Sequence, residues 1–491
     1  MAVRRRAIAP RNVFIDFTLK TMKKMNKNAI TKLCLSALLL LIALGAGAQQ
    51  KSLRQMQQDF EDLRFGMFTH FALPTYAPAD WSDPDMPPLA FNPTKLDCNQ
   101  WAKAAKSANM RFGCLSVKHH NGFCLWATKT TDYNVMNSPL HKDLVKAYCD
   151  AFRKQGMKVM FHFSVLDTHN KLRPHMITPE KIQMMKDQLT ELLTNYGPVT
   201  AIIFDGYEAP WGRISYEDVN FQEVYDLIKS LQPNCLVLDM NSAKYPREAL
   251  FYTDIKFYEQ GAGQKISTDE NTLPAVACLP LQRTWFWKDD MPKSKLRDPK
   301  DFVENTLIPY GKAHCTFILN AAPNRDGLID DNAVEALKEI GKLNKDDINN
   351  TYPLPQCEAP ITEKNIAKNK PSESSWSDDT NIMDLANDDD FGSAWYSFSE
   401  VKTPFWEVNL EGEKQFNQIV ITEPRGGVIQ AYRLQYLHNG KWNTLFDGPA
   451  KTNSRVKIHN FNTVRGSKVR ITITSSNGEP AIAEFGVYEP F

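Results

Sequence analysis

Short apolar runs alternate with amphipathic segments from about residue 60 to residue 320. The runs have the length of strands, and segments between the early ones place their apolar residues on one face, as helices do. Three such helices are predicted, at 97–110, 142–156 and 179–197. Eight strands are predicted, at 64–72, 112–118, 157–164, 200–206, 235–240, 254–259, 283–288 and 314–320. Strands that alternate with helices pair in parallel, so the pattern indicates an α/β fold with a closed (β/α)8 barrel. The alternative is an open doubly wound sheet, but no G-x-G-x-x-G motif follows the first strand.

Each predicted strand carries a polar residue at its carboxyl end. In a (β/α)8 barrel these ends converge on one face, where active sites lie. The residues are His70, Lys118 with His119 and His120, Ser164, Asp205, Asp239, Glu259, Lys288 and Asn320. Histidines at these positions need not be buried in a core.

The pattern changes after about residue 350. The stretch 357–381 is polar and contains Pro and Ser, and beyond it short runs alternate apolar and polar residues, as in the antiparallel strands of a β-sandwich. We therefore expect four parts: an extension with a signal peptide at 1–48, a catalytic barrel at 49–350, a linker at 351–370 and a β-sandwich at 371–491.

The amino terminus has the pattern of a secretory signal peptide. Lysines precede an apolar run at 33–48 that ends in Ala46-Gly47-Ala48, which predicts cleavage before Gln49. The run is short for a membrane span, so we expect an exported protein, periplasmic or secreted, with no span in the mature chain. Residues 1–21 read as an upstream extension of a start at Met22 or Met25.

The net charge and the absence of several motifs argue against some classes of function. The net charge of +1 gives no field that would attract nucleic acid. No C-x-x-C pair, G-x-S-x-G elbow, P-loop or H-E-x-x-H motif is present. No cofactor and no metal site is predicted. Aromatic residues make up 11% of the chain, and sugar-binding surfaces are one of several explanations.

Two carboxylates stand at the ends of predicted strands. Asp205 closes the run AIIFD, and Glu259 closes a strand two further along the chain. Glycosidases use such a pair, one as nucleophile and one as acid. An Asp that caps a turn and an exposed Glu that enters a loop are the alternative interpretations. The rivals for the acid role are Glu208, Asp167 and Asp254.

Four histidines lie at predicted strand ends: His70, His119, His120 and His162. Imidazoles at one barrel mouth can bind zinc, or they can form hydrogen bonds with sugar hydroxyls. Adjacent residues of a strand point to opposite faces, so His119 and His120 can both face inward only if the strand has ended. Tryptophans are candidates for stacking on a sugar, although any single one is more often part of a core. The predicted substrate-binding residues are His70, Trp81, Lys118, His119, His120, His162, Trp211 and Trp285.

The runs RFGMFTHFA, KHHNGFCLW and AIIFDGYEAPW, with TDYNV and FHFS between them, resemble the catalytic domain of glycoside hydrolase family 29 α-L-fucosidases over residues 60–345. The resemblance implies a retaining mechanism with Asp205 as nucleophile. It implies that His70, Trp81, His119 and His120 hold fucose hydroxyls, and it assigns the acid/base role to Glu259, which follows Asp254 by five residues. A retaining enzyme predicts that the two carboxyl groups lie about 5–5.5 Å apart.

The chain departs from the family pattern at several positions. Asn121 stands where the family has Asp, Phe71 and Ala72 replace Trp-Gly, and His162 and Phe163 replace two tyrosines. An Arg common after the fifth strand is missing from LDMNSAKYP. These departures are typical of the branch that acts on α-1,3/1,4-linked fucose of branched, Lewis-type glycans.

The tail from about residue 365 resembles a discoidin-like module (coagulation factor type C, carbohydrate-binding family 32) in runs such as FWEVNLEGEKQFNQIVITE. The expectation is therefore an exo-α-L-fucosidase with a fucosylated oligosaccharide or glycoconjugate as its substrate. The alternatives are a fucose-binding protein that has lost catalysis and a retaining glycosidase for another sugar.

Overall fold

The computed structural model describes residues 50–209, 211–269, 271–398 and 400–490. The predicted signal peptide and upstream extension lie outside these residues. No helix among the described residues combines the length and the apolar character that crossing a membrane requires.

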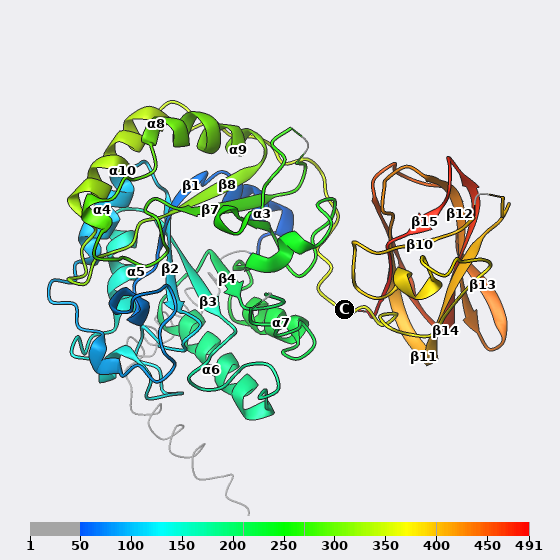
Figure 1. Cartoon of the computed structure of the whole chain (residues 1–491), viewed down its shortest axis with the longest axis horizontal. Coiled ribbons are helices and arrows are strands. Elements are labelled where there is room, and N and C mark those ends of the chain that lie inside the picture. Colours follow the sequence, from blue (N-terminus) through cyan, green and yellow to red (C-terminus); the bar gives the residue numbers. More distant parts are fainter. Residues whose placement is uncertain (1–49, 210, 270, 399, 491) are drawn as a thin grey trace, which may run out of the picture. The chain divides into compact units, whose positions relative to one another are not determined.

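Eight parallel strands form one sheet in the order β5-β4-β3-β2-β1-β8-β7-β6. The first four are β1 (Phe65–Thr69), β2 (Phe112–Lys118), β3 (Lys158–Ser164) and β4 (Ala201–Asp205). The others are β5 (Leu236–Asp239), β6 (Lys256–Glu259), β7 (Ala275–Pro280) and β8 (Cys315–Asn320). The sheet curls into a barrel, with helices around its outer surface (Figure 1). The predicted (β/α)8 architecture is confirmed.

The helices follow the strands in sequence. They are α4 (Cys98–Ser107), α5 (Leu144–Lys154), α6 (Pro179–Asn195), α7 (Phe221–Leu231), α8 (Pro299–Phe302), α9 (Ile308–Lys312) and α10 (Asp331–Asn344). Their starts follow ordinary capping chemistry, because Asp97, Asp143 and Thr178 each accept a hydrogen bond from a first-turn N–H of α4, α5 and α6. The three helices predicted from the apolar pattern are confirmed.

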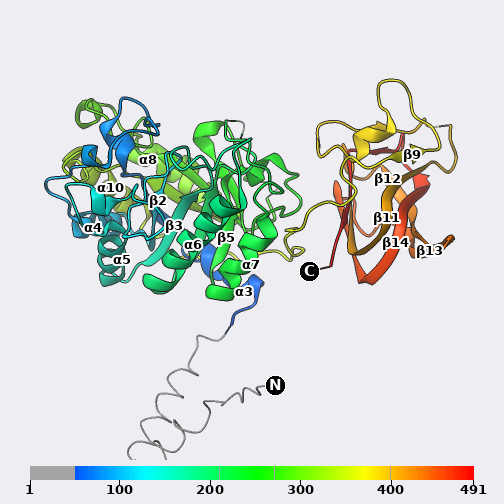
Figure 2. The same ribbon diagram turned by 90° about the horizontal axis from the view of Figure 1, so that it is seen from below.

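A further helix, α3 (Leu53–Glu61), lies at one end of the barrel (Figure 2). Met56 and Phe60 pack against the interior residues of the strands. The Glu61 carboxylate accepts a hydrogen bond from the Ala275 N–H, at the first residue of β7. Helix α3 therefore covers the amino-terminal end of the barrel, opposite the carboxyl ends where the predicted site residues stand.

One predicted strand is wrong. The seventh strand is β7 at Ala275–Pro280, and 283–288 is a loop that follows it. The aromatic run of the loop suits a strand, but the N–H groups of Trp285 and Phe286 donate to the Asp80 carboxylate and not to a neighbouring strand. Lys288 consequently does not end a strand, and its ammonium group donates to backbone carbonyls such as that of Pro74.

Strands β5 and β6 stand at the two ends of the hydrogen-bonded path. Single hydrogen bonds, several of them from side chains, join the chain at β5 to the chain at β6. The Asp254 N–H donates to the Val237 carbonyl at 2.7 Å, and the Val237 N–H donates to the Asp254 carboxylate at 2.9 Å. Lys256 of β6 donates to carbonyl groups of the segment after β5, among them that of Tyr245 at 3.0 Å. We call this junction between β5 and β6 the seam.

The C-terminal module is an antiparallel β structure. Its main sheet runs β13-β12-β14-β11-β16, with β9 paired to β11, and β10 pairs with β15. Trp395 and Trp406 are fully buried in its core. The strands are β9 (Ser372–Ser374), β10 (Trp395–Tyr396), β11 (Phe405–Thr422), β12 (Ile429–His438), β13 (Lys441–Pro449), β14 (Val456–Ser476), β15 (Ala481–Ile482) and β16 (Glu484–Tyr488). The predicted β-sandwich is confirmed.

Candidate active site

A small pocket lies at the carboxyl ends of the barrel strands. Its volume is about 110 Å³, well below the roughly 300 Å³ of the smallest pockets that hold drug-sized ligands. The pocket is lined by His70, Asp80, Trp81, His119, His120, Asp205, Trp211, Met240, Glu259 and Trp285.

The two predicted carboxylates meet in this pocket. Asp205 is the last residue of β4, and Glu259 is the last residue of β6. The three rivals for the acid role are engaged in ion pairs outside it: Glu208 with Lys244 at 2.9 Å, Asp254 with Lys229 at 2.7 Å and Asp167 with Lys118 at 3.6 Å.

The surroundings of the two carboxyl groups separate their pKa values. Burial alone would raise the pKa of Asp205, but hydrogen bonds from His162 and from the Gly206 backbone oppose it, and this pKa lies below its ordinary value of 3.8. For Glu259, burial and then the negative charge of Asp205 raise the pKa from 4.5 to about 7, against the opposing effect of a hydrogen bond with Trp285. At neutral pH, Asp205 is therefore ionised and Glu259 is substantially protonated, as a nucleophile and an acid must be.

His162 contacts the Asp205 carboxylate and not the pocket. Its Nε2 lies 3.2 Å from Asp205 Oδ2, its Nδ1 lies 2.9 Å from the Ser116 hydroxyl, and its side chain is almost fully buried. His162, a predicted substrate-binding residue, lies two residues before the end of β3, where it contacts Asp205 and is not among the residues that line the pocket.

His119 and His120 both line the pocket, with ring centroids 4.0 Å apart. Strand β2 ends at Lys118, so the two histidines follow the strand and are free of its alternation. A loop holds them in place: the Thr168 N–H donates to the His120 carbonyl at 2.9 Å.

Lys118, one of the predicted substrate-binding residues, is not among the residues that line the pocket. Strict alternation would point Lys118 inward with Ser116, but the pairing of β2 with β3 shifts between these two residues. Such a bulge turns the side chain outward. There its ammonium group lies 2.9 Å from Gln188 Oε1, near Asp167, and 4.1 Å from the centre of the Phe163 ring.

We expect Lys118→Met to lower the free energy of unfolding by about 3–5 kcal/mol, because Asp167 would keep its carboxylate in a fully buried site without its cation. Chemical denaturation measures this loss. Lys146→Met is the matched control, since Lys146 pairs with Asp150 on the exposed face of α5 and should cost far less. Equal losses in the two variants would contradict the structural role of Lys118.

The three predicted tryptophans line the pocket in different ways. Trp81 and Trp211 are 43% and 48% exposed, and their rings meet edge to face at a centroid distance of 5.0 Å. Trp285 is half-buried and lies 5.2 Å from the His70 ring. Two of the three indoles are therefore largely exposed to solvent at the edge of the pocket.

Asp80 is a pocket residue that the sequence interpretation missed. Its two carboxylate oxygens accept the Trp285 and Phe286 N–H groups at 3.0 and 3.1 Å. Asp80 therefore fixes the loop that brings Trp285 beside Glu259. No predicted strand or motif precedes Asp80. Its position next to Trp81 in PADWSD is the one feature of the sequence that indicates a place in the pocket.

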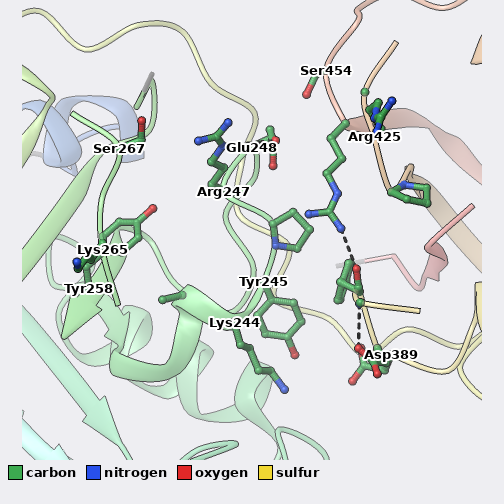
Figure 3. Close-up of a pocket in the computed structure, with 18 of the residues that line it drawn as sticks. Lys244, Tyr245, Arg247, Glu248, Tyr258, Lys265, Ser267, Asp389, Arg425 and Ser454 are labelled. Atoms are coloured by element: carbon green, nitrogen blue, oxygen red, sulfur yellow. Dashed lines mark hydrogen bonds and ion pairs between the residues drawn. The ribbon is translucent and has the colours of Figure 1, made fainter. Parts of the chain in front are cut away.

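A larger hollow lies elsewhere, next to the segments that follow β5 and β6 (Figure 3). Lys244, Arg247 and Glu248 are among its lining residues, which include none of the predicted site residues. No group of three or more His, Cys, Asp or Glu residues in the described part of the chain could hold a metal ion.

The fold and the paired carboxyl groups define the class of the protein, a (β/α)8 glycosidase. Comparison with known proteins gives the family. The Alpha-L-fucosidase family model matches residues 75–347, more than half of the chain, and the chain belongs to this family. The F5/8 type C domain model matches residues 365–485. The expected α-L-fucosidase with a discoidin-like module, and with it the glycoside hydrolase class, is confirmed.

Known α-L-fucosidases match this chain at modest identity. Alpha-L-fucosidase 1 of Arabidopsis thaliana is 25% identical over 86% of this chain and 84% of its own length. Tissue alpha-L-fucosidase of Bos taurus is 22% identical over 58% of this chain and 66% of its own. The structure of alpha-L-fucosidase isoenzyme 1 from Paenibacillus thiaminolyticus aligns with a TM-score of 0.53 at 23% identity, over 86% of this chain and all of that one. This likeness shows the fold.

Proposed function

We propose that this chain is a retaining exo-α-L-fucosidase that removes terminal α-1,3/1,4-linked fucose from branched glycans. The observation that carries the proposal is the pair Asp205 and Glu259, two carboxyl groups of one pocket with pKa values displaced in opposite directions. Family membership supports fucose as the sugar.

Asp205 acts first as nucleophile. Its carboxylate attacks the anomeric carbon and forms a fucosyl ester while the glycosidic bond breaks, and Glu259 gives its proton to the departing oxygen. Glu259 is then a carboxylate, and it takes a proton from the water whose oxygen attacks the same carbon, while the ester bond between that carbon and Asp205 breaks. Free fucose leaves, and both carboxyl groups return to their initial forms.

His162 supports the nucleophile. A hydrogen bond from His162 Nε2 stabilises the ionised form of Asp205. The small pocket volume supports removal of a single terminal sugar, and the replaced positions Phe71, Ala72, Asn121 and Phe163 support the branched-glycan branch of the family.

The deciding experiment compares fucose release from Lewis-type trisaccharides and from 2-fucosyllactose. Release only from the branched glycans, with α-L-fucose as the first product in proton NMR, supports both the linkage and retention. β-L-Fucose as the first product would exclude a retaining mechanism. Binding of fucosylated glycan without any release would identify a binding protein that has lost catalysis.

We expect Trp211→Ala to reduce kcat/KM for a Lewis-type trisaccharide roughly tenfold, because the exposed indole loses its contact with the sugars of the leaving group. α-L-Fucosyl fluoride is the matched control substrate, since its leaving group is a single atom. Its kcat/KM should change less than about twofold. Equal losses for the two substrates would place Trp211 against the fucose ring instead.

A further inference from the structure

The partners of His70 fix which of its ring nitrogens carries a proton. Asn320, the last residue of β8, donates its side-chain N–H to the Trp285 carbonyl at 2.8 Å, and its amide oxygen lies 2.9 Å from His70 Nδ1. Reversing the amide would set its oxygen against the Trp285 carbonyl oxygen, so the orientation is fixed. Nδ1 must therefore be the donor. Burial lowers the pKa of His70 to about 3, so the ring is neutral and its Nε2 carries a lone pair.

His120 has the same arrangement with different partners. The Ser164 hydroxyl lies 2.7 Å from the Leu166 carbonyl, which can only accept, so the hydroxyl proton is used there. Ser164 must then accept from His120 Nδ1, 2.8 Å away. Burial lowers the pKa of His120 to about 4 although Asp205 opposes the shift, so Nε2 of this ring also carries a lone pair.

His162 has its proton at the other nitrogen. Its Nε2 forms the hydrogen bond with the Asp205 carboxylate, which requires a proton on Nε2. His120 Nε2 is 3.5 Å from the same carboxylate oxygen, so two acceptors face one region of the pocket. A donor that enters this region can form a hydrogen bond with either acceptor. Hydroxyl groups of a sugar are such donors.

We propose that Asn320 and Ser164 are positioning residues that hold His70 and His120 as Nδ1–H tautomers, so that both imidazoles accept hydrogen bonds from hydroxyl groups of the bound sugar. The proposal rests on the proposed function for the identity of its ligand, and it extends that function by setting the direction of two hydrogen bonds. The preferred ligand is a pyranose with two free hydroxyl donors. A sugar with fluorine in place of either hydroxyl cannot donate and should be rejected.

The tautomers can be measured without any ligand. Protein labelled with nitrogen-15 at histidine gives two-bond proton–nitrogen correlations that separate the Nδ1–H, Nε2–H and imidazolium forms, and each signal is assigned by its loss in a single His→Gln variant. We expect the Nδ1–H form for His70 and His120 at neutral pH. An Nε2–H form or an imidazolium at either residue would overturn the proposal.

The direction of the bonds is tested with L-fucose and its 2-, 3- and 4-deoxyfluoro derivatives, by calorimetry. Fluorine at two of the three positions should weaken binding about 10- to 100-fold, because a buried acceptor stays unpaired. Tolerance of fluorine at every position would show that the histidines donate. If L-fucose itself does not bind while the tautomers are as expected, the proposed function fails and the tautomer assignment stands.

The variant Asn320→Asp tests whether Asn320 positions His70 or only stabilises the fold. A carboxylate beside Nδ1 raises the pKa of His70, so the imidazolium forms as the pH falls and Nε2 becomes a donor. Affinity for L-fucose should then fall at least about tenfold more than in wild type between about pH 8 and pH 5.

Asn344→Asp is the matched control for Asn320→Asp. Asn344 is another buried amide that donates to a backbone carbonyl, that of Ala108 before β2, at the opposite end of the barrel. The Asn344→Asp variant should be less stable than wild type, but its affinity for L-fucose should show no new pH dependence. The same pH profile for both variants would contradict the positioning role of Asn320.

Discussion

Asp205→Ala is expected to reduce kcat/KM for a fucosylated trisaccharide by at least about 10⁴-fold. The carboxylate that forms the fucosyl ester would be gone, and no other carboxyl group of the pocket can replace it. Glu259 is substantially protonated at neutral pH, and both oxygens of Asp80 accept backbone N–H groups. Release of fucose from the trisaccharide, followed by chromatography, measures the loss.

The loss should come from chemistry and not from unfolding. The folded state stabilises the Asp205 carboxylate, whose pKa is lowered and which accepts a hydrogen bond from His162, so its removal should lower the melting temperature somewhat. A variant that is still folded at the assay temperature shows that the loss is chemical. Azide provides a second test. With α-L-fucosyl fluoride as substrate, azide can enter the space left in Asp205→Ala and displace fluoride from the face opposite to it, giving β-L-fucosyl azide. Formation of the α-azide, or activity near that of wild type, would remove Asp205 from the nucleophile role.

Glu259→Gln is expected to reduce kcat/KM for the trisaccharide by about 10²- to 10⁴-fold. A sugar leaving group needs a proton and fluoride does not, so the formation of the fucosyl ester from α-L-fucosyl fluoride should be far less affected. Rapid-quench measurement of the fluoride burst detects this first step. Glu208→Gln is the matched control, because Glu208 pairs with Lys244 outside the pocket. A large loss in Glu208→Gln with little loss in Glu259→Gln would exchange the two roles.

The pH profile gives an independent test of the same residue. The acid must be protonated, so kcat/KM should fall as the pH rises through about 7, the pKa to which burial and Asp205 raise Glu259. The nucleophile must be ionised, so kcat/KM should also fall in acid, at a pH below the ordinary pKa of 3.8 for Asp205. The fall on the alkaline side should be absent in Glu259→Gln. If it persists there, another group is the acid.

Much of the barrel could be predicted because its strands are apolar runs bounded by helices. Strand β7, which was not predicted, shows where the apolar pattern fails. Its small residues Ala275 and Ala277 give little strand signal, and the aromatic run that follows gives a strong one. Partners far away in the chain hold that aromatic run as a loop, among them the carboxylate of Asp80, some 200 residues earlier, and the side chain of Asn320.

The pocket residues could be predicted where an ionisable side chain stands at the end of a predicted strand, as for Asp205, Glu259 and His70. Lys118 and His162 show why the rest was not. A bulge in β2 turns the Lys118 side chain to the outside of the barrel, and the local sequence pattern does not predict this bulge. His162 contacts Asp205 from a deeper level of the barrel, and this level depends on the register of β3 with β4.

The seam has a consequence for the spacing of the two carboxyl groups. The short path around the barrel from Asp205 to Glu259 crosses from β5 to β6, where side chains such as Lys256 and Asp254 take the place of a backbone ladder. Burial lowers the pKa of Lys256 to about 7, so its ammonium group is partly discharged at neutral pH. The spacing of Asp205 and Glu259 across the seam therefore depends in part on side chains. Residues 254 and 256 are consequently the positions at which substitutions would change this spacing without altering either carboxyl group.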